Sequence, residues 1–215
     1  MVPVRKKNSD IRLCVDFRNI NKSSEKDNYL VPPMEQILQK VSGFEMLSLL
    51  DGFLRYNQIF VSPDDQLKTD FRTPWGTYAY RKMPFGLINA GATFQRTMDI
   101  AFRGLINHSV VVYLDGVTVY SKYRPNHINH LKKVFERCRK FGVSLNPKKT
   151  IFVVSEGILL GCMVSKHGIM IDPKRTQAIS KITYPSSKKA MQSFLGKINF
   201  VRRFIPSFSE IIRPL

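Results

Sequence analysis

Apolar and polar residues follow two different periods along the chain, and each period predicts a different kind of element. Apolar residues alternate with polar ones over 11–17, and nearly continuous apolar runs fill 45–51 and 109–121; both patterns are typical of strands. Residues 151–171 are also expected to be mostly strand. Turn residues of the Pro, Gly and Asp types separate three shorter segments that we expect to be strands: 56–62, 68–73 and 77–83.

Apolar residues spaced three and four apart alternate with these strands and predict helices. Five helices are expected, over 31–44, 89–105 and 125–142 and near 173–182 and 186–205. Asp172 and Pro173 suit the start of the fourth helix, with Asp as the N-cap and Pro as the first helical residue. Because strands and helices mix without a regular βαβ alternation, we expect an α+β fold with an antiparallel sheet, followed by a small helical piece.

The run VVVYLDGVTVYS, residues 110–121, has an Asp-Gly pair at its centre, Asp115 and Gly116. Asp-Gly between two apolar runs is a strong signal for a hairpin with a two-residue type I′ turn, in which both central residues have φ > 0. An acid at the tip of such an apolar hairpin is also a candidate metal ligand. Both interpretations are open from the run alone.

The net charge points to a polyanionic partner. The chain has 215 residues, 43% of them hydrophobic as in a globular protein, and carries a formal charge of +18 at pH 7. Nucleic acid is the simplest partner for this excess, although acidic lipid or solubility alone are alternatives. Residues 122–149 and 174–215 each contain nine basic residues and one acidic residue. We expect these two basic segments to line a groove for nucleic acid.

Cysteine and hydropathy patterns indicate an intracellular protein. Cys14, Cys138 and Cys162 lie among apolar neighbours without the spacing of metal ligands, so we expect buried, reduced thiols. No apolar run approaches the roughly 18 residues of a membrane span, and the basic, polar N-terminus differs from a signal peptide. The expected location is the cytoplasm or nucleus, with no membrane partner.

Two carboxylates stand at the ends of apolar runs. Asp51 follows MLSLL, and Asp115 follows VVVYL. If the two strands are neighbours in the sheet, both carboxylates meet at one edge, where they need a shared cation or proton. Mg²⁺ suits such a pair because it prefers oxygen ligands, and two such ions are common in nucleotidyl transfer. Taken singly, each Asp also fits an ordinary turn or strand end.

Six segments of the sequence follow one another in an informative order: RLCVDFRNINK (12–22), LSLLDGFLRYNQI (47–59), KTDFRTPWGTYAYRKMPFGLINAGATFQRTM (68–98), VVVYLDGVTVYS (110–121), GILLGCMVSKHGI (157–169) and SFLGKINFVRRFIPSFS (193–209). In order and spacing they resemble the motifs of reverse transcriptases, most closely those of gypsy-type long-terminal-repeat retrotransposons. The resemblance implies a right-hand polymerase fold with an antiparallel palm sheet, flanking helices, partial fingers and a small helical thumb. It divides the chain into fingers and palm with a primer-grip hairpin, residues 1–171, and the start of the thumb or connection, residues 172–215.

The resemblance also implies roles for single residues. Asp51 and Asp115 would be the catalytic, metal-binding aspartates, for two Mg²⁺ ions in an intact site, with Mn²⁺ as a possible substitute. Tyr56 would lie under the nucleotide sugar and exclude a 2′-hydroxyl. The remaining implied roles are triphosphate binding by Arg12 with Lys6 or Lys7, lining of the nucleotide pocket by Phe85 and Gly86, and the primer grip at Leu160 and Gly161.

Three departures from the family pattern predict impaired chemistry. The family turn has two adjacent acids, whereas Gly116 follows Asp115 here, so one carboxylate of the set is missing. Gly adopts φ > 0 readily, so we expect the hairpin itself to be retained. Losing one charged stabiliser of the transition state typically costs about 10²–10³ in rate, so polymerisation is expected to be strongly reduced or absent. Arg55 replaces a usually small residue, and Gly91 a usual Pro, which points the same way.

The first functional hypothesis is an RNA-directed DNA polymerase domain of retrotransposon origin, which transfers nucleotides from a dNTP to a primer 3′-hydroxyl on an RNA or DNA template–primer duplex. The second is a catalytically inactive or repurposed module that keeps nucleic-acid binding. The third is a marginally folded remnant without a selected function. The protease, RNase H and integrase regions of retrotransposon polyproteins are expected to be absent from this chain.

Overall fold

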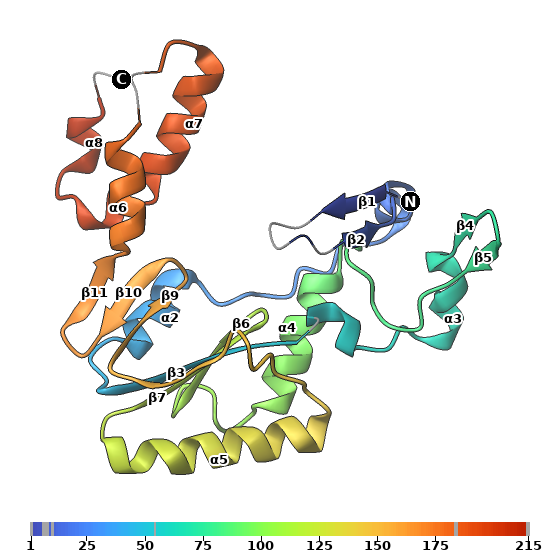
Figure 1. Cartoon of the computed structure of the whole chain (residues 1–215), viewed down its shortest axis with the longest axis horizontal. Helices are drawn as coiled ribbons and strands as arrows, with labels where there is room; N and C mark the ends of the chain where they lie inside the picture. The colour runs from blue at the N-terminus through green and yellow to red at the C-terminus, as the bar shows by residue number, and fades with distance from the viewer. Residues whose placement is uncertain (1, 6–8, 10, 54, 183–184, 214–215) are drawn as a thin grey trace.

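A four-stranded antiparallel sheet forms the centre of the molecule (Figure 1). The structure, a computed structural model, describes residues 2–5, 9, 11–53, 55–182 and 185–213. The central strands lie in the order β6 (Val110–Tyr113), β7 (Gly116–Ser121), β3 (Met46–Asp51) and β8 (Ile151–Val154). All three pairings are antiparallel, which confirms the expected α+β fold.

Smaller sheets and helices surround this centre. The outer strands are β1 (Val2–Arg5) with β2 (Ile11–Cys14), β4 (Phe71–Thr73) with β5 (Gly76–Tyr78), and β9 (Glu156–Leu159), β10 (Cys162–Ser165) and β11 (Gly168–Ile171) as a third sheet. The α-helices are α1 (Arg18–Ser23), α2 (Met34–Val41), α3 (Pro63–Gln66), α4 (Ala90–Ala101), α5 (Arg124–Phe141), α6 (Pro173–Ser180), α7 (Lys188–Asn199) and α8 (Phe208–Ile211). The 3₁₀ helices are η1 (Arg55–Gln58), η2 (Leu67–Thr69) and η3 (Arg202–Phe204).

The central sheet is buried on both faces, which explains the continuous apolar runs of its strands. Val110 and Val112 pack with α4 and α5 on one face, whereas Val111 packs with α2 and β10 on the other. A third, smaller core around Ile198, Val201 and Phe208 holds the C-terminal helices together. The sheet thus has two helix-covered faces, and its strand ends remain available for a site.

Most predicted elements are confirmed in type, with shifted ends. The predicted strand over 56–62 is wrong: η1 begins at Arg55, and only Phe60 forms an isolated bridge, with Lys82. Tyr56 packs edge-to-face on Phe94 of α4, so the chain turns sharply after β3 instead of continuing as a strand. The Asp172 cap is confirmed, since its carboxylate accepts a hydrogen bond from the Lys174 amide.

The hairpin at 110–121 is confirmed, but its predicted turn geometry is wrong. Tyr113 pairs with Gly116, so Leu114 and Asp115 are the central turn residues and Gly116 begins β7. Of these three residues only Leu114 has a positive φ, 51°, as at the first central position of a type II′ turn. Gly116 therefore does not adopt the left-handed conformation that was expected for it. The turn with positive φ at both central residues occurs instead at Leu160 and Gly161, between β9 and β10.

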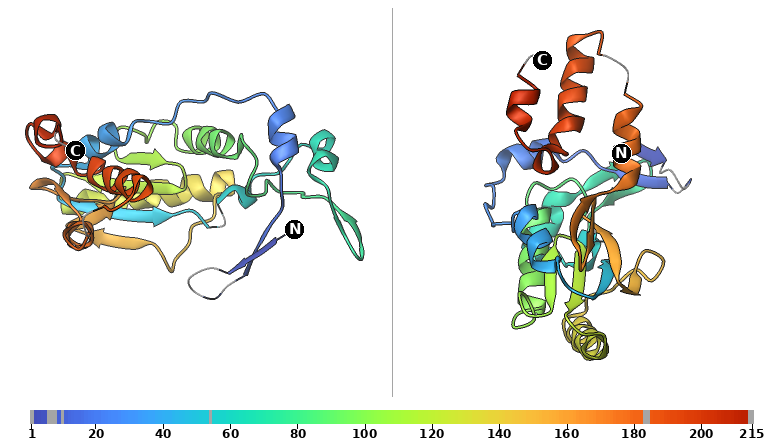
Figure 2. Two further views of the ribbon diagram at one scale, coloured as in Figure 1. Left: turned by 90° about the horizontal axis from the view of Figure 1, so that it is seen from above. Right: turned by 90° about the vertical axis from the view of Figure 1, so that its left-hand side faces the viewer.

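The helical part of the first basic segment, α5, lies apart from the second basic segment, which corrects the expectation that both whole segments line one groove; Lys149, beyond α5, lies instead beside Asp51. Residues 124–141 form α5, which covers the face of the sheet that also packs on α4. The segment 174–213 belongs to the C-terminal helices, which stand at the opposite end of the molecule from α5 in both Figure 1 and Figure 2. The order of charged residues along the sequence does not reveal that the two segments are separated in space. The strands between the two segments reverse the direction of the chain.

The cysteines follow the expectation in two of three positions. Cys138 and Cys162 are buried, and burial raises the pKa of the Cys138 thiol to about 11. Cys14 is partly exposed. Among the residues that the structure describes, no helix combines the length and apolarity needed to cross a bilayer.

A buried polar chain joins α5 to the sheet. The Ser48 hydroxyl accepts a hydrogen bond from the Val153 amide (3.0 Å) and lies 2.7 Å from Nε2 of the fully buried His127. Nδ1 of His127 lies 2.8 Å from the Ser121 hydroxyl, which also contacts His130. Both hydroxyls and both ring nitrogens of His127 have a hydrogen-bond partner if the Ser48 hydroxyl donates to His127 Nε2 and His127 Nδ1 donates to the Ser121 hydroxyl. This arrangement needs a neutral His127, and burial lowers its pKa.

We predict that acid destabilises the fold through His127. Its folded-state pKa lies below the ordinary value of about 6.5, so the unfolded chain binds the additional proton. The His127 contribution to the free energy of unfolding is therefore complete above about pH 6.5 and is lost as the pH falls from there towards the folded pKa. Urea unfolding of the wild type and His127→Asn at several pH values measures this slope.

The exposed His167 supplies the matched control. His167→Asn should retain the wild-type pH dependence, whereas His127→Asn should flatten it. An equal slope in all three proteins would contradict a role for His127.

Candidate active site

Two carboxylates lie side by side at one end of the central sheet. Asp51, the last residue of β3, pairs across the strands with Gly116, which directly follows Asp115. The Gly52 amide donates a hydrogen bond of 2.8 Å to the Asp115 carbonyl. The strands that precede the two aspartates are not neighbours, since β7 lies between β6 and β3. The return strand of the hairpin therefore brings Asp115 beside Asp51.

Each carboxylate is paired with a basic side chain. Nε of Arg55 forms a salt bridge with Oδ2 of Asp115, and Nζ of Lys149 lies 3.7 Å from Oδ2 of Asp51. The Asp115 and Asp51 side chains are 19% and 26% exposed, so bulk water screens these pairs only partly. From the sequence, Arg55 was recognised only as a departure from a family pattern and Lys149 only as part of a basic segment. The carboxylate partner of neither residue was predicted.

The backbone around Asp51 is fixed by the loop before β8. The Asp51 carbonyl accepts a hydrogen bond of 2.7 Å from the Asn146 amide, and the Asp51 amide donates to Thr150 Oγ1. Thr150 Oγ1 in turn donates to the Asn146 carbonyl, 2.7 Å away. This closed set of bonds holds Asp51 and Lys149 on adjoining segments, which explains their proximity.

Aromatic rings form a wall beside the carboxylates. Tyr56 follows Arg55 in η1 and packs edge-to-face against Phe85 at 5.2 Å and Phe94 at 5.8 Å. Gly86 has φ +105°, and a Cβ there would lie 3.2 Å from the Phe17 ring, so both the conformation and the space favour Gly. The neighbouring loop is anchored by Asn21, which donates to the Gly86 carbonyl and accepts from the Ile88 amide.

The other predicted site residues lie elsewhere or outside the described residues. The turn at Leu160 and Gly161 lies against the C-terminal helices: a Cβ on Gly161 would come within 2.6 Å of Arg175, whose guanidinium also lies 3.9 Å from the Phe200 ring centre. The backbone of Arg12 pairs with Val4, while its side chain is not described. Lys6 and Lys7 lie outside the described residues.

A buried glutamine supports the turn that carries Asp115, and its role was missed from the sequence. Oε1 of Gln95, a fully buried residue of α4, accepts a hydrogen bond of 2.7 Å from the Leu114 amide. Its Nε2 donates to Asp99 Oδ1, and Asp99 Oδ2 accepts from the Tyr29 hydroxyl at 2.7 Å. This hydrogen bond to Asp99 raises the pKa of Tyr29. Leu114 needs such support because a bulky residue at positive φ is strained.

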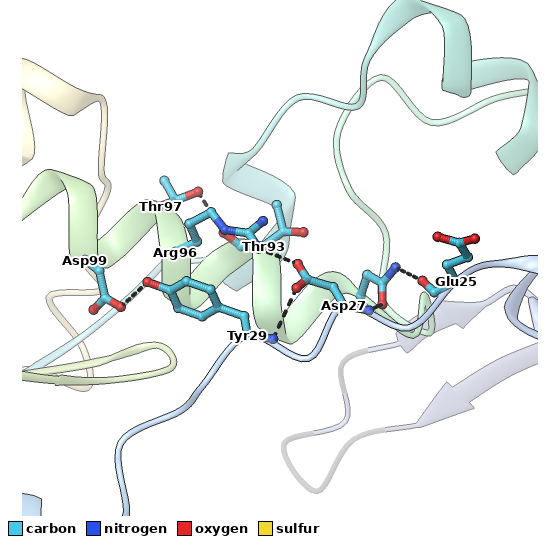
Figure 3. A network of polar contacts seen from close by, with 8 residues as sticks. Glu25, Asp27, Tyr29, Thr93, Arg96, Thr97 and Asp99 are labelled. Atoms are coloured by element: carbon cyan, nitrogen blue, oxygen red, sulfur yellow. Dashed lines mark hydrogen bonds and ion pairs between the residues drawn. The ribbon is translucent and has the colours of Figure 1, made fainter.

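The same helix is tied to the segment before α2 (Figure 3). Arg96 donates to Asp27 at 2.7 Å, and its guanidinium lies 4.7 Å from the centre of the Tyr29 ring. Asn89 accepts from the Asp27 amide and donates to the Glu25 carbonyl. The segment 25–29 therefore lies along α4, and three hydrogen bonds, through Asp99 and Gln95, connect Tyr29 to the turn at Leu114.

The residues present do not fit a pair of divalent ions. Asp51 and Asp115 supply the hard oxygen ligands that Mg²⁺ prefers, but Gly116 supplies none, and both carboxylates already carry a basic partner. Within the described part of the chain, no three His, Cys, Asp or Glu residues are grouped to hold a metal ion.

Comparisons with known proteins agree on one family. The family described as "Reverse transcriptase (RNA-dependent DNA polymerase)" matches residues 4–196. The retrovirus-related Pol polyprotein from transposon 297 of Drosophila melanogaster is 34% identical over 204 residues, which are 95% of this chain and 19% of that protein. The Tf2-3 transposon polyprotein of Schizosaccharomyces pombe is 30% identical over 212 residues, 99% of this chain and 16% of that protein. The chain thus spans about a fifth of the length of such relatives.

Solved structures give the same result for the fold. The foamy viral protease-reverse transcriptase in complex with double-stranded DNA is similar at a TM-score of 0.92 and 26% identity, over 99% of this chain and 37% of that one. The corresponding complex with an RNA/DNA hybrid gives a TM-score of 0.86 at 26% identity, over 99% of this chain and 28% of that one. The α+β architecture of this chain is therefore that of the right-hand polymerase fold.

We predict that Gln95→Met destabilises the protein by about 1–3 kcal/mol, because it leaves the partly buried Leu114 amide without an acceptor. Methionine has nearly the volume of glutamine, so packing changes little. Gln192→Met, on the exposed face of α7, is the control and should cost less than about 0.5 kcal/mol. Urea unfolding measures both. If the two variants are equally stable, Gln95 does not support the turn.

Proposed function

Because the chain belongs to the reverse transcriptase (RNA-dependent DNA polymerase) family and is a domain of retrotransposon origin, we propose that it binds a template–primer duplex of RNA or DNA and that its nucleotidyl transfer is strongly impaired. One observation carries the second half of this proposal. The residue that faces Asp51 across the strands and adjoins Asp115 is Gly116, which has no carboxylate.

Duplex binding is supported by charge and by the related complexes. The chain carries a formal charge of +18, and its C-terminal helices contribute exposed lysines at positions 188, 189 and 197. The solved relatives were studied with double-stranded DNA and with an RNA/DNA hybrid. In this proposal, residues 1–171 are the fingers and palm with a primer grip at Leu160 and Gly161, and residues 172–215 begin the thumb.

Nucleotide binding is proposed for the aromatic residues near the carboxylates. Tyr56 would lie under the sugar of a dNTP, with Phe85 and Gly86 as further walls, because the three are joined by ring contacts and a tight loop. Arg12 with Lys6 or Lys7 would bind the triphosphate through charge-assisted hydrogen bonds. Of these basic residues, Arg12 belongs to β2.

Asp51 and Asp115 are the proposed catalytic and metal-binding residues. Reverse transcriptases normally use divalent metal ions, and Mg²⁺, with Mn²⁺ as a substitute, is the proposed cofactor. Asp51 and Asp115 would hold such an ion, which would supply positive charge for nucleotidyl transfer. With only two carboxylates, each neutralised by Arg55 or Lys149, this chain holds such an ion weakly.

The alternative function is a nucleic-acid-binding module without catalysis. The salt bridges of Arg55 and Lys149 favour it, because they stabilise the carboxylates without any metal ion. Both functions share duplex binding and differ only in residual primer extension. A binding experiment therefore tests both functions together, and primer extension separates them.

We predict salt-dependent duplex binding that depends on the C-terminal helices. Each phosphate contact contributes about 0.9 to the slope of log K against log[salt], so combining Lys188→Gln, Lys189→Gln and Lys197→Gln should make the slope shallower by about 1–2. The control combines Lys132→Gln, Lys133→Gln and Lys140→Gln, exposed lysines of α5 on the opposite side of the sheet. Fluorescence anisotropy with a labelled primer–template measures both slopes. If the slope becomes shallower by the same amount in both triple variants, the C-terminal helices are not the duplex-binding face.

We predict that Gly116→Asp raises the rate of primer extension by about 10²–10³ at saturating Mg²⁺ or Mn²⁺, because it supplies the missing carboxylate. The substitution fits the backbone: φ of Gly116 lies outside the left-handed region, and a Cβ there would meet only the Tyr113 carbonyl, at 3.4 Å. Extension per mole of folded protein is the measurement, with Asp51→Asn added to Gly116→Asp as the negative control. If Gly116→Asp gains nothing, the site is defective at another residue.

A further inference from the structure

We propose that the guanidinium of Arg55 acts as the resident cation of Asp115, so that a divalent metal ion binds the carboxylate pair only by displacing it. This inference rests on the proposed function, because it concerns the same carboxylates. It adds a second defect that is independent of Gly116. Arg55 thereby determines whether this site takes up a metal ion at all.

The contact itself is the first argument. Nε of Arg55 is paired directly with Oδ2 of Asp115, whose side chain is 19% exposed, whereas the Arg55 side chain is 47% exposed. The guanidinium therefore covers the solvent side of a largely buried carboxylate. The Nε–H group of Arg55 occupies one acceptor site of Oδ2, and its positive charge lies within a few ångströms of any metal ion at this carboxylate. Arg55 and a metal ion therefore compete for Asp115.

The backbone of Arg55 is the second argument. Its φ is 45°, in the left-handed region that costs free energy for any residue with a Cβ and almost none for glycine. Arginine is held in this conformation at the start of η1, between β3 and the aromatic wall formed with Tyr56. The salt bridge to Asp115 offsets part of the strain. Replacement by glycine would remove the cation and the strain together.

Charge balance gives the third argument. The two carboxylates contribute −2, and Arg55 with Lys149 contributes +2, so the site as a whole is neutral and does not attract a divalent cation. The two basic residues are not equivalent. Lys149 is 65% exposed and lies 3.7 Å from Asp51, so it moves aside into water more readily than Arg55. Arg55 is therefore the stronger competitor.

The experiment measures Mn²⁺ binding by electron paramagnetic resonance of the free ion, without nucleic acid or nucleotide. We expect Arg55→Gly to bind Mn²⁺ at least about tenfold more tightly than the wild type, because one positive charge is removed from within a few ångströms of the ion. Arg55→Asn, which also tolerates the left-handed region, should show the same gain and provides a second variant if Arg55→Gly folds poorly. Adding Asp115→Asn to either variant should abolish the gain.

Two controls separate the specific effect from the general field of the protein. Arg55→Lys keeps the positive charge but holds Asp115 less firmly, so its gain in Mn²⁺ affinity should be smaller than that of Arg55→Gly. Lys68→Ala removes an exposed charge that pairs with Asp65, away from the carboxylates, and should also change little. The proposal is overturned if Arg55→Gly and Arg55→Asn bind no more tightly than the wild type, or if Lys68→Ala gains as much as they do.

The outcome is independent of the proposed function, because no step of the measurement needs a duplex. Loss of duplex binding with a retained Mn²⁺ gain would reject the proposed function and leave Arg55 as the resident cation. Normal duplex binding without a gain in Mn²⁺ affinity would reject Arg55 as the resident cation and leave the proposed duplex binding in place.

Discussion

The antiparallel pairing of β3 with β7 is the constraint on which the site depends. Its register sets Met46 opposite Ser121 at one end and Asp51 opposite Gly116 at the other. A slip by one residue would exchange the two buried faces, so the packing of α4 and α5 on one face and of α2 and β10 on the other fixes the register. The position of Asp51 beside Asp115 therefore follows from hydrophobic packing. The chemistry at this edge depends on which side chains occupy these backbone positions.

At that edge, electrostatics and backbone strain act together. Leu114 and Arg55 both have positive φ, on the two segments that meet at Asp115. The buried Gln95 supports the first through the Leu114 amide, and the salt bridge to Asp115 supports the second. Lys149 completes the neutralisation at Asp51. The result is a site whose charges are satisfied within the chain, which stabilises the fold and opposes the uptake of a divalent cation.

The sequence predicted the fold class, most elements and the proximity of the two aspartates, because these depend on hydrophobic period and on a resemblance spread over the whole chain. Its failures have particular causes. The Asp-Gly pair suggested a turn at the wrong residues, since the pairing of Tyr113 with Gly116 is set by the register of β6 and β7. The strand expected at 56–62 was replaced by η1 because Tyr56 packs on α4. The partners of Arg55, Lys149 and Gln95 were not predictable, since they lie 60, 98 and 19 residues away in the sequence.

We propose that this reverse transcriptase domain combines a duplex-binding framework with a candidate catalytic edge that is both one carboxylate short and neutralised by its own cations. The most direct test is single-turnover extension of a prebound primer–template, which isolates the chemical step from binding. We expect extension to increase from the wild type to Gly116→Asp and to increase again when Arg55→Gly is added to Gly116→Asp. A wild-type rate equal to that of the double variant would contradict the account.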